Sequence, residues 1–323
     1  MKILVTGCSG FIGFHLCNLL LKNKNYKIYG IDNLNNYYDT SLKKNRLKIL
    51  KKKNKFVFYK LDICSHKLLE KKFADNNFDI VIHLAAQAGV RYSISNPEKY
   101  LKSNIDGFFN VLTSIQKYKI KHFIFASTSS VYGSNNKFPT SENVSTDKPL
   151  SFYAASKKSN EVMAYSFSNI FNIPMTCLRF FTVYGEYGRP DMSLHKFVSK
   201  IIQNKNIDLF NKGNHQRDFT YVGDVVEIIK RIIKNPSTKK IPYQVFNVAS
   251  GKPKKLLYFV SVIEKKLNKK ANINFLDLQQ GDVVKTHANQ SKITKLTGHA
   301  NYTDFEKGID KFIKWFKKYY NHK

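Results

Sequence analysis

Short apolar runs rich in β-branched and aromatic residues alternate with longer segments of helical periodicity through the first 180 residues. Predicted strands span residues 2–6, 27–32, 56–62, 79–85, 122–127 and 175–180. Predicted helices lie between them near residues 11–22, 65–75, 97–118 and 151–171. Strands that alternate with helices in this way are typical of a parallel sheet covered by helices on both faces. The pattern therefore predicts an α/β fold built on a doubly wound parallel sheet.

After residue 180 the pattern becomes mixed. Residues 181–191 have the glycines and proline of a loop, and one strand is predicted at 243–249. Helices are predicted near residues 192–204, 223–234, 256–267 and 304–319. We expect a first domain over residues 1–180 and a smaller, mainly substrate-binding lobe over residues 181–323, with room for some segments of the second part to return to the first.

The first predicted strand leads directly into a glycine-rich turn, TGCSGFIG, that opens the first helix. Gly7, Gly10 and Gly13 let the backbone turn tightly and approach a pyrophosphate, to which the helix N-terminus offers free N–H groups. The next strand ends at Asp32, whose carboxylate can accept hydrogen bonds from an adenosine ribose and would repel a 2′-phosphate. The pattern predicts a Rossmann-type domain that binds NAD in preference to NADP.

Further cofactor contacts are expected at the carboxyl ends of the strands, where a dinucleotide crosses a sheet of this type. These expected contacts are Phe11, Ile12, Asn33, Asp62, Ile63, Leu84, Ala85 and Ala86. His83 lies inside a predicted strand, so we interpret it as a core residue and not as a catalytic one.

Tyr153 and Lys157 lie four residues apart, on one face of a predicted helix. A phenol has an ordinary pKa of about 10, too high for a base near neutrality. A neighbouring ammonium and the positive nicotinamide ring of NAD both favour the phenolate. The pair therefore predicts a base that works with oxidised cofactor bound, in which Lys157 also holds the nicotinamide ribose.

Four segments, TGCSGFIG, LAAQAGVR, STSSVYG and YAASK, follow one another along the chain. Together they resemble the extended short-chain dehydrogenase/reductase family, whose members act mostly on nucleotide sugars, and the resemblance covers essentially the whole chain. It implies a catalytic set of Thr128, Tyr153 and Lys157. In that set the threonine hydroxyl binds the reacting sugar oxygen and relays its proton toward the tyrosine.

The segment after Thr128 contains no carboxylate. Dehydratases that resemble this chain carry Asp-Glu there, and the decarboxylases place a glutamate in the same short segment, whereas this chain has Ser129 and Ser130. A serine has no usable pKa for acid–base chemistry at a second carbon. The site is therefore expected to oxidise a sugar and reduce it again, which is epimerisation.

The resemblance implies that Thr128, Ser129, Ser130 and Thr182 hold the carboxylate of a uronate sugar. The two serines could instead satisfy backbone groups at the end of the strand. The expected reaction interconverts UDP-glucuronate and UDP-galacturonate through a transient 4-keto sugar, with tightly bound NAD. Epimerisation of UDP-glucose or UDP-N-acetylglucosamine is the nearest alternative, and decarboxylation is a more distant one.

Arginine pairs well with phosphate oxygens, and three arginines are candidates for binding the substrate diphosphate. By resemblance these are Arg217, Arg189 and, with less support, Arg91. Arg179 is expected to be structural. Asp224 is expected to order a helix and not to bind substrate.

The formal net charge of +31 raises the question of nucleic-acid binding. The chain has 54 lysines and arginines, of which only six are arginines, and the lysines are scattered through nearly every segment. Proteins that read nucleic acids concentrate their charge and favour arginine, so we interpret the lysines as a compositional bias and expect no nucleic-acid partner.

The remaining composition favours a cytoplasmic location. No run of 18 apolar residues predicts a membrane span, and the four cysteines show neither pairing nor metal-ligand spacing. We therefore expect no membrane association and no metal. The resemblance further implies a homodimer formed through the helical stretches near 97–118 and 151–171.

Overall fold

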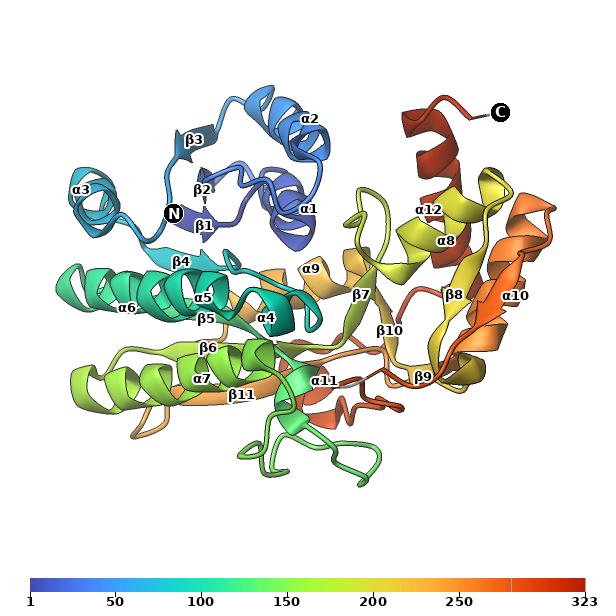
Figure 1. Ribbon diagram of the computed structural model, residues 1–323. Coiled ribbons are helices and arrows are strands. Elements are labelled where there is room, and N and C mark those ends of the chain that lie inside the picture. Colours follow the sequence, from blue (N-terminus) through green and yellow to red (C-terminus); the bar gives the residue numbers. More distant parts are fainter. Residues whose placement is uncertain (280, 323) are drawn as a thin grey trace.

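The computed structural model describes residues 1–279 and 281–322 (Figure 1). Its largest element is a seven-stranded parallel sheet in the order β11-β6-β5-β4-β1-β2-β3. The strands are β1 (Lys2–Thr6), β2 (Lys27–Asp32), β3 (Phe56–Lys60), β4 (Ile80–His83), β5 (His122–Thr128), β6 (Met175–Phe180) and β11 (Tyr243–Val248). The strand order reverses between β1 and β4, which places a crevice at their carboxyl ends.

Helices cover both faces of this sheet, and each face has its own apolar core (Figure 1). One core is closed by α3 (His66–Asn76), α6 (Gly107–Lys117) and α7 (Phe152–Phe171). The other is closed by α1 (Phe11–Leu20), α2 (Thr40–Lys51), α9 (Val222–Ile232) and α11 (Ser291–Thr297). The predicted doubly wound parallel sheet is confirmed. Because α9, α11 and β11 lie beyond residue 180, both parts of the chain build the larger domain.

A smaller lobe packs around a third apolar core. It contains α8 (Ser193–Ile202), α10 (Leu256–Leu267) and α12 (Phe305–Tyr319), with β8 (Ile207–Leu209) paired in parallel to β13 (Ile273–Phe275). Strand β7 (Thr182–Tyr184) pairs with β10 (Phe219–Tyr221) between α9 and the core of the lobe, and β9 (Gln216–Arg217) pairs with β12 (Lys254–Lys255) beside α10.

Several predicted elements need correction. The sequence pattern predicted no helix between β2 and β3, yet α2 occupies residues 40–51; its inner face includes the buried Lys43 and Arg46, which hides its amphipathic pattern. The predicted helix 97–118 is divided into α5 (Pro97–Tyr100), the π-helical turn η1 (Leu101–Asp106) and α6. Strands β3 and β4 end two residues before the predicted boundaries.

Short helical segments complete the fold. They are α4 (Tyr92–Ser95), η2 (Ser129–Tyr132) and η3 (Phe210–Gly213). Within residues 1–279 and 281–322, no helix has both the length and the apolar character that crossing a bilayer requires.

Three of the buried histidines are expected to make the fold sensitive to acid. Burial lowers the pKa of His83 to about 3 and the pKa values of His122 and His195 to about 4. His83 also shares a hydrogen bond of 2.9 Å with the hydroxyl of Thr6, which agrees with its predicted role in the core.

We expect the free energy of unfolding to fall as the pH drops from 6.5 toward 4. In this range the histidines of the unfolded chain become protonated, whereas the buried ones stay neutral. Each such histidine therefore lowers the free energy of unfolding by up to ~2 kcal/mol at pH 5. Urea unfolding at pH 5 to 8 measures this slope. His122→Gln should make it shallower, whereas substitution of the exposed His66 by Asn should leave it unchanged. An identical slope in both variants would contradict this origin of the acid sensitivity.

Candidate active site

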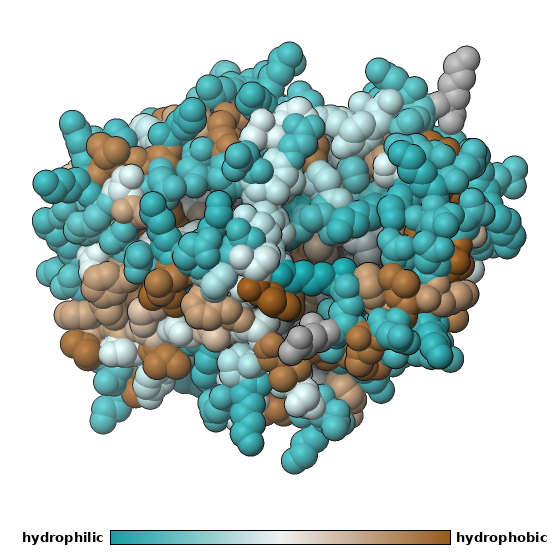
Figure 2. All heavy atoms as spheres, in the orientation of Figure 1, coloured by the Kyte–Doolittle hydropathy of each residue, from teal (hydrophilic) through white to brown (hydrophobic). Residues whose placement is uncertain are grey.

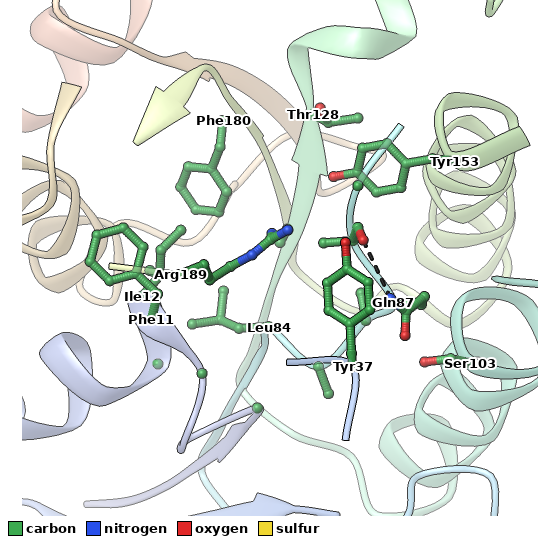
Figure 3. A pocket seen from close by; sticks show the side chains of 18 of the residues that line it. Phe11, Ile12, Tyr37, Leu84, Gln87, Ser103, Thr128, Tyr153, Phe180 and Arg189 are labelled. Carbon is green, nitrogen blue, oxygen red and sulfur yellow. Dashed lines mark hydrogen bonds between the residues drawn. The ribbon is translucent and has the colours of Figure 1, made fainter. Parts of the chain in front are cut away.

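A cavity of about 430 Å³ opens at the carboxyl edge of the sheet, where the strand order reverses. The glycine turn, the ends of β2 to β5 and the first turns of α7 form most of its wall. Loops that lead into the smaller lobe contribute Arg189 and Met192, so both parts of the molecule line the cavity (Figure 3).

The glycine turn forms an anion cradle at one end of the cavity. Gly7 has a φ of +71°, and a Cβ on Gly13 would lie 2.1 Å from the carbonyl oxygen of Gly7. Helix α1 begins after Gly10, which provides no side-chain cap, so the N–H groups of its first turn are available to a ligand. A tight glycine turn with free N–H groups at the start of a helix is suited to binding the pyrophosphate of a dinucleotide.

Asp32 lies buried at the end of β2, beside this cradle. Its carboxylate accepts hydrogen bonds from the backbone N–H groups of Ser9 (3.0 Å) and Leu34 (2.8 Å). Burial raises the pKa of Asp32, and these two N–H groups together with the ammonium of Lys43 act against that rise. The carboxylate is thus held in one orientation at the predicted ribose position.

The structure gathers all of the predicted cofactor residues at this cavity. They are Gly7, Gly10, Phe11, Ile12, Gly13, Asp32, Asn33, Asp62, Ile63, Leu84, Ala85, Ala86, Tyr153 and Lys157. The side-chain amide of Asn33 donates to the carboxylate of Asp62 at 2.9 Å, so the ends of β2 and β3 are tied together around the predicted adenosine position.

Tyr153 enters the cavity from the first turn of α7, and Thr128 faces it from the end of β5 (Figure 3). Burial raises the pKa of Tyr153, while the hydroxyl of Thr128 and the positive charge of Arg189 act to lower it. The spacing of Tyr153 and Lys157 predicted that the ammonium of Lys157 would also lower this pKa. In the structure the ammonium of Lys157 instead donates to the carbonyl oxygen of Ala126 at 2.9 Å, and burial lowers its own pKa to about 8.

The hydroxyl cluster forms one wall of the cavity. Thr128, Ser129, Ser130 and Thr182 all line it. The hydroxyl of Thr128 accepts from the backbone N–H of Ser130 and donates to the Ser130 hydroxyl, both at 3.2 Å. Thr128 therefore provides the acceptor for a backbone N–H at the end of the strand, and the hydroxyls of Ser129 and Ser130 are not needed for that purpose.

The three predicted substrate arginines are in different environments. Arg189 lines the cavity and forms an ion pair with Asp191, to which its Nε donates at 3.0 Å. Arg91 and Arg217 are not among the residues that line it. Arg91 is half exposed, with its guanidinium 3.2 Å from the carboxylate of Asp282, and Arg217 donates to the carbonyl oxygen of Val284 at 2.8 Å. Their contact with substrate stays a prediction.

Arg179, which was expected to be structural, forms a buried ion pair behind the wall. Arg179 on β6 donates to both carboxylate oxygens of Glu161 on α7, at 2.9 and 2.7 Å, and Ser127 on β5 donates to the same carboxylate at 2.6 Å. Glu161 follows Lys157 by four residues, which is the one sequence signal that could have linked it to the site.

Other residues around the cavity gave no sequence signal. Asn104, in the π-helical turn, binds the backbone N–H of Gln87 at 2.8 Å and the hydroxyl of Ser156 at 3.0 Å, so it joins the loop after β4 to α7. Tyr37 and Lys43 also line the cavity, because the unpredicted α2 and the loop before it fold over the end of β2.

Asp224, which was expected to order a helix, lies in the first turn of α9 and accepts hydrogen bonds from the backbone N–H and the hydroxyl of Thr303. Across residues 1–279 and 281–322, no cluster of three or more histidines, cysteines or acidic residues could hold a metal ion.

The anion cradle and the paired tyrosine and lysine on one cavity define a dinucleotide-dependent enzyme of the extended short-chain dehydrogenase/reductase class. The chain belongs to the NAD dependent epimerase/dehydratase family, whose sequence model matches residues 3–249.

Known proteins that this chain resembles support that assignment along its full length. UDP-glucuronate 4-epimerase 1 of Arabidopsis thaliana is 40% identical over 336 residues, which span 100% of this chain and 78% of the relative. The UDP-glucuronic acid 4-epimerase of Bacillus cereus, in complex with UDP-glucuronic acid and NAD, superposes with a TM-score of 0.93 at 34% identity, covering 99% of this chain and 100% of that one. The UDP-glucose 4-epimerase of Thermotoga maritima superposes with a TM-score of 0.89 at 28% identity, covering 99% and 100%.

We expect Gly13→Ala to abolish NAD binding, because a Cβ 2.1 Å from the carbonyl oxygen of Gly7 must displace the whole turn. Gly10→Ala places its Cβ 3.0 Å from the same oxygen and should weaken binding less. Bound NAD is measured by chromatography after acid extraction of the purified protein, and circular dichroism checks that each variant folds. A folded Gly13→Ala variant with the wild-type NAD content would rule out this cradle as the pyrophosphate site.

Proposed function

We propose that this protein is an NAD-dependent UDP-glucuronate 4-epimerase, which interconverts UDP-glucuronate and UDP-galacturonate. The observation that carries the proposal is the cavity wall of Thr128, Ser129, Ser130 and Thr182, which supplies hydroxyls and no carboxylate beside Tyr153. Such a wall can bind an anionic sugar substituent without adding a second acid–base group.

NAD, when bound, supplies the acceptor and then the donor of a hydride at the sugar C4. Tyr153 is the base that removes the proton from the 4-hydroxyl of the sugar. The hydroxyl of Thr128 relays this proton to Tyr153. The positive charge of Arg189 favours the phenolate against the effect of burial. After oxidation the 4-keto sugar turns about its diphosphate link, and Tyr153 returns the proton to the same oxygen when the opposite face is reduced.

The wall also suits a substrate that must keep its carboxylate. The 4-keto form of a uronate is a β-keto acid, which loses CO₂ readily if its carboxylate is badly oriented. Neutral hydroxyls hold the carboxylate in place, and the guanidinium of Arg189, one of the cations that line the cavity, is already paired with Asp191. This arrangement favours epimerisation over decarboxylation.

We predict that the protein converts UDP-glucuronate in preference to UDP-glucose and UDP-N-acetylglucosamine. Removing both serine hydroxyls by Ser129→Ala and Ser130→Ala should lower kcat/KM for UDP-glucuronate by about 10- to 100-fold, the size expected for lost hydrogen bonds to a charged group. Chromatography of the products from each sugar measures the preference.

Ser145→Ala, in an exposed loop, is the matched control, and Tyr153→Phe defines the background rate. Conversion of UDP-glucose alone would eliminate the proposal in favour of the nearest alternative. Release of CO₂ with a pentose product would indicate a decarboxylase.

We further propose that two copies pair through the exposed sides of α6, α7 and η1. Large apolar side chains are exposed there: Leu101, Phe109, Val162 and Ile170. Figure 2 shows brown and tan side chains gathered over the part of the surface formed by α6 and α7. Residues 159–195 contain no lysine in a lysine-rich chain, so two copies of this α7 surface can approach with little charge repulsion. The four free cysteines support a reducing, cytoplasmic location for such a dimer.

Val162→Glu should shift the protein from dimer to monomer, because it places a charge in the apolar centre of the proposed interface. Light scattering after size-exclusion chromatography measures the mass. Leu68→Glu, at an exposed apolar position on α3, controls for the added charge. A wild-type protein that is monomeric at micromolar concentration, or a dimeric Val162→Glu variant, would refute this interface.

A further inference from the structure

Two loops from different parts of the chain meet over the cavity. The cofactor loop, residues 33–39, follows β2, and the lobe loop, residues 185–192, leads into α8. Tyr37 of the first loop donates its phenolic hydrogen to Asp191 of the second, with 3.1 Å between the oxygens. Tyr37 and Arg189 both face the cavity (Figure 3), and the ion pair between Arg189 and Asp191 fixes the carboxylate that receives the bond.

Arg46 holds the bases of the same two loops. Its fully buried guanidinium donates to the carbonyl oxygen of Ser9 in the glycine turn at 2.9 Å and to the hydroxyl of Tyr38 at 2.7 Å. A further hydrogen bond reaches the carbonyl oxygen of Tyr187 in the lobe loop. Because Arg46 joins the loops behind the cavity, the bond between Tyr37 and Asp191 is a second, outer connection.

The backbone around this outer connection is constrained. Leu34 and Tyr187, one in each loop, have φ values of 54°, a left-handed conformation that is unfavourable for a bulky residue. Gly89 has a φ of +107°, which favours glycine, and a Cβ there would lie 2.6 Å from the hydroxyl oxygen of Tyr37. Without a side chain, Gly89 leaves the space that the Tyr37 phenol occupies at the cavity.

We propose that the hydrogen bond between Tyr37 and Asp191 is a clasp that holds the cofactor loop and the lobe loop closed over bound NAD. Tyr37 then acts as a positioning residue, whose effect on the cofactor passes through the loops. A clasp has a chemical purpose in this family, because an enzyme that lost its reduced cofactor between the two hydride transfers would leave a ketone behind. The inference rests on NAD dependence and not on which UDP-sugar is converted.

The test measures how fast the purified holoenzyme releases NAD, without any sugar present. Protein loaded with NAD is mixed with an excess of the fluorescent ethenoadenine analogue of NAD, and the exchange is followed over time. Tyr37→Phe removes only the donor of the clasp and should release NAD about tenfold faster, as expected for losing a hydrogen bond to a carboxylate. Asp191→Asn removes the charged acceptor and should have a similar effect.

Two controls make the result specific. Tyr92→Phe keeps the ring that packs 4.9 Å from the Tyr37 ring and should exchange at the wild-type rate. Because both single variants act on the same bond, which Tyr37→Phe removes and Asp191→Asn weakens, the double variant Tyr37→Phe/Asp191→Asn should be no faster than the faster single variant. Exchange by Tyr37→Phe within twofold of wild type, or effects that multiply in the double variant, would overturn the proposal.

Discussion

The buried ion pair between Glu161 and Arg179 sets the geometry on which the active site depends. It joins α7, which carries Tyr153 and Lys157, to β6, and through Ser127 to β5, which ends in the hydroxyl wall. Two buried charges lose several kcal/mol of hydration, and this loss is offset only when geometry and additional hydrogen bonds are good. Here the carboxylate accepts three hydrogen bonds of 2.9 Å or less. The interaction therefore fixes the distance between Tyr153 and the wall of hydroxyls.

The parallel topology explains why the remaining groups meet at one edge. The carboxyl ends of β1, β2, β4 and β5 all face the same side, so the anion cradle, Asp32 and Thr128 converge although they are far apart in sequence. The smaller lobe then adds Arg189 and Met192 across the crevice. The cavity is therefore lined by both parts of the molecule and belongs to neither part of the chain alone.

The parts of the fold that could be predicted from sequence were those with local signals. Strand periodicity, the glycine turn and the spacing of Tyr153 and Lys157 each appear within a few residues, and the structure brings them together at the cavity. Helix α2 could not be predicted, because it buries Lys43 and Arg46. Hydrogen bonds from these side chains to backbone carbonyl groups outside the helix make their burial possible. The partner of Arg91 is Asp282, and the partner of Lys157 is the carbonyl oxygen of Ala126. Both contacts join segments that are distant in sequence, so no local pattern could predict them.

The return of α9 and β11 to the larger domain has a consequence for biosynthesis. A nascent chain that has only reached residue 180 has an unpaired edge on β6 and an uncovered apolar surface on α1, because β11 and α9 are still to be translated. Such an edge can pair with other chains, and it stays available until residue 248 has left the ribosome. Completion of the dinucleotide domain is thereby delayed until most of the polypeptide has been made, and a chaperone that shields β6 during this interval would protect the protein when it is most prone to aggregate.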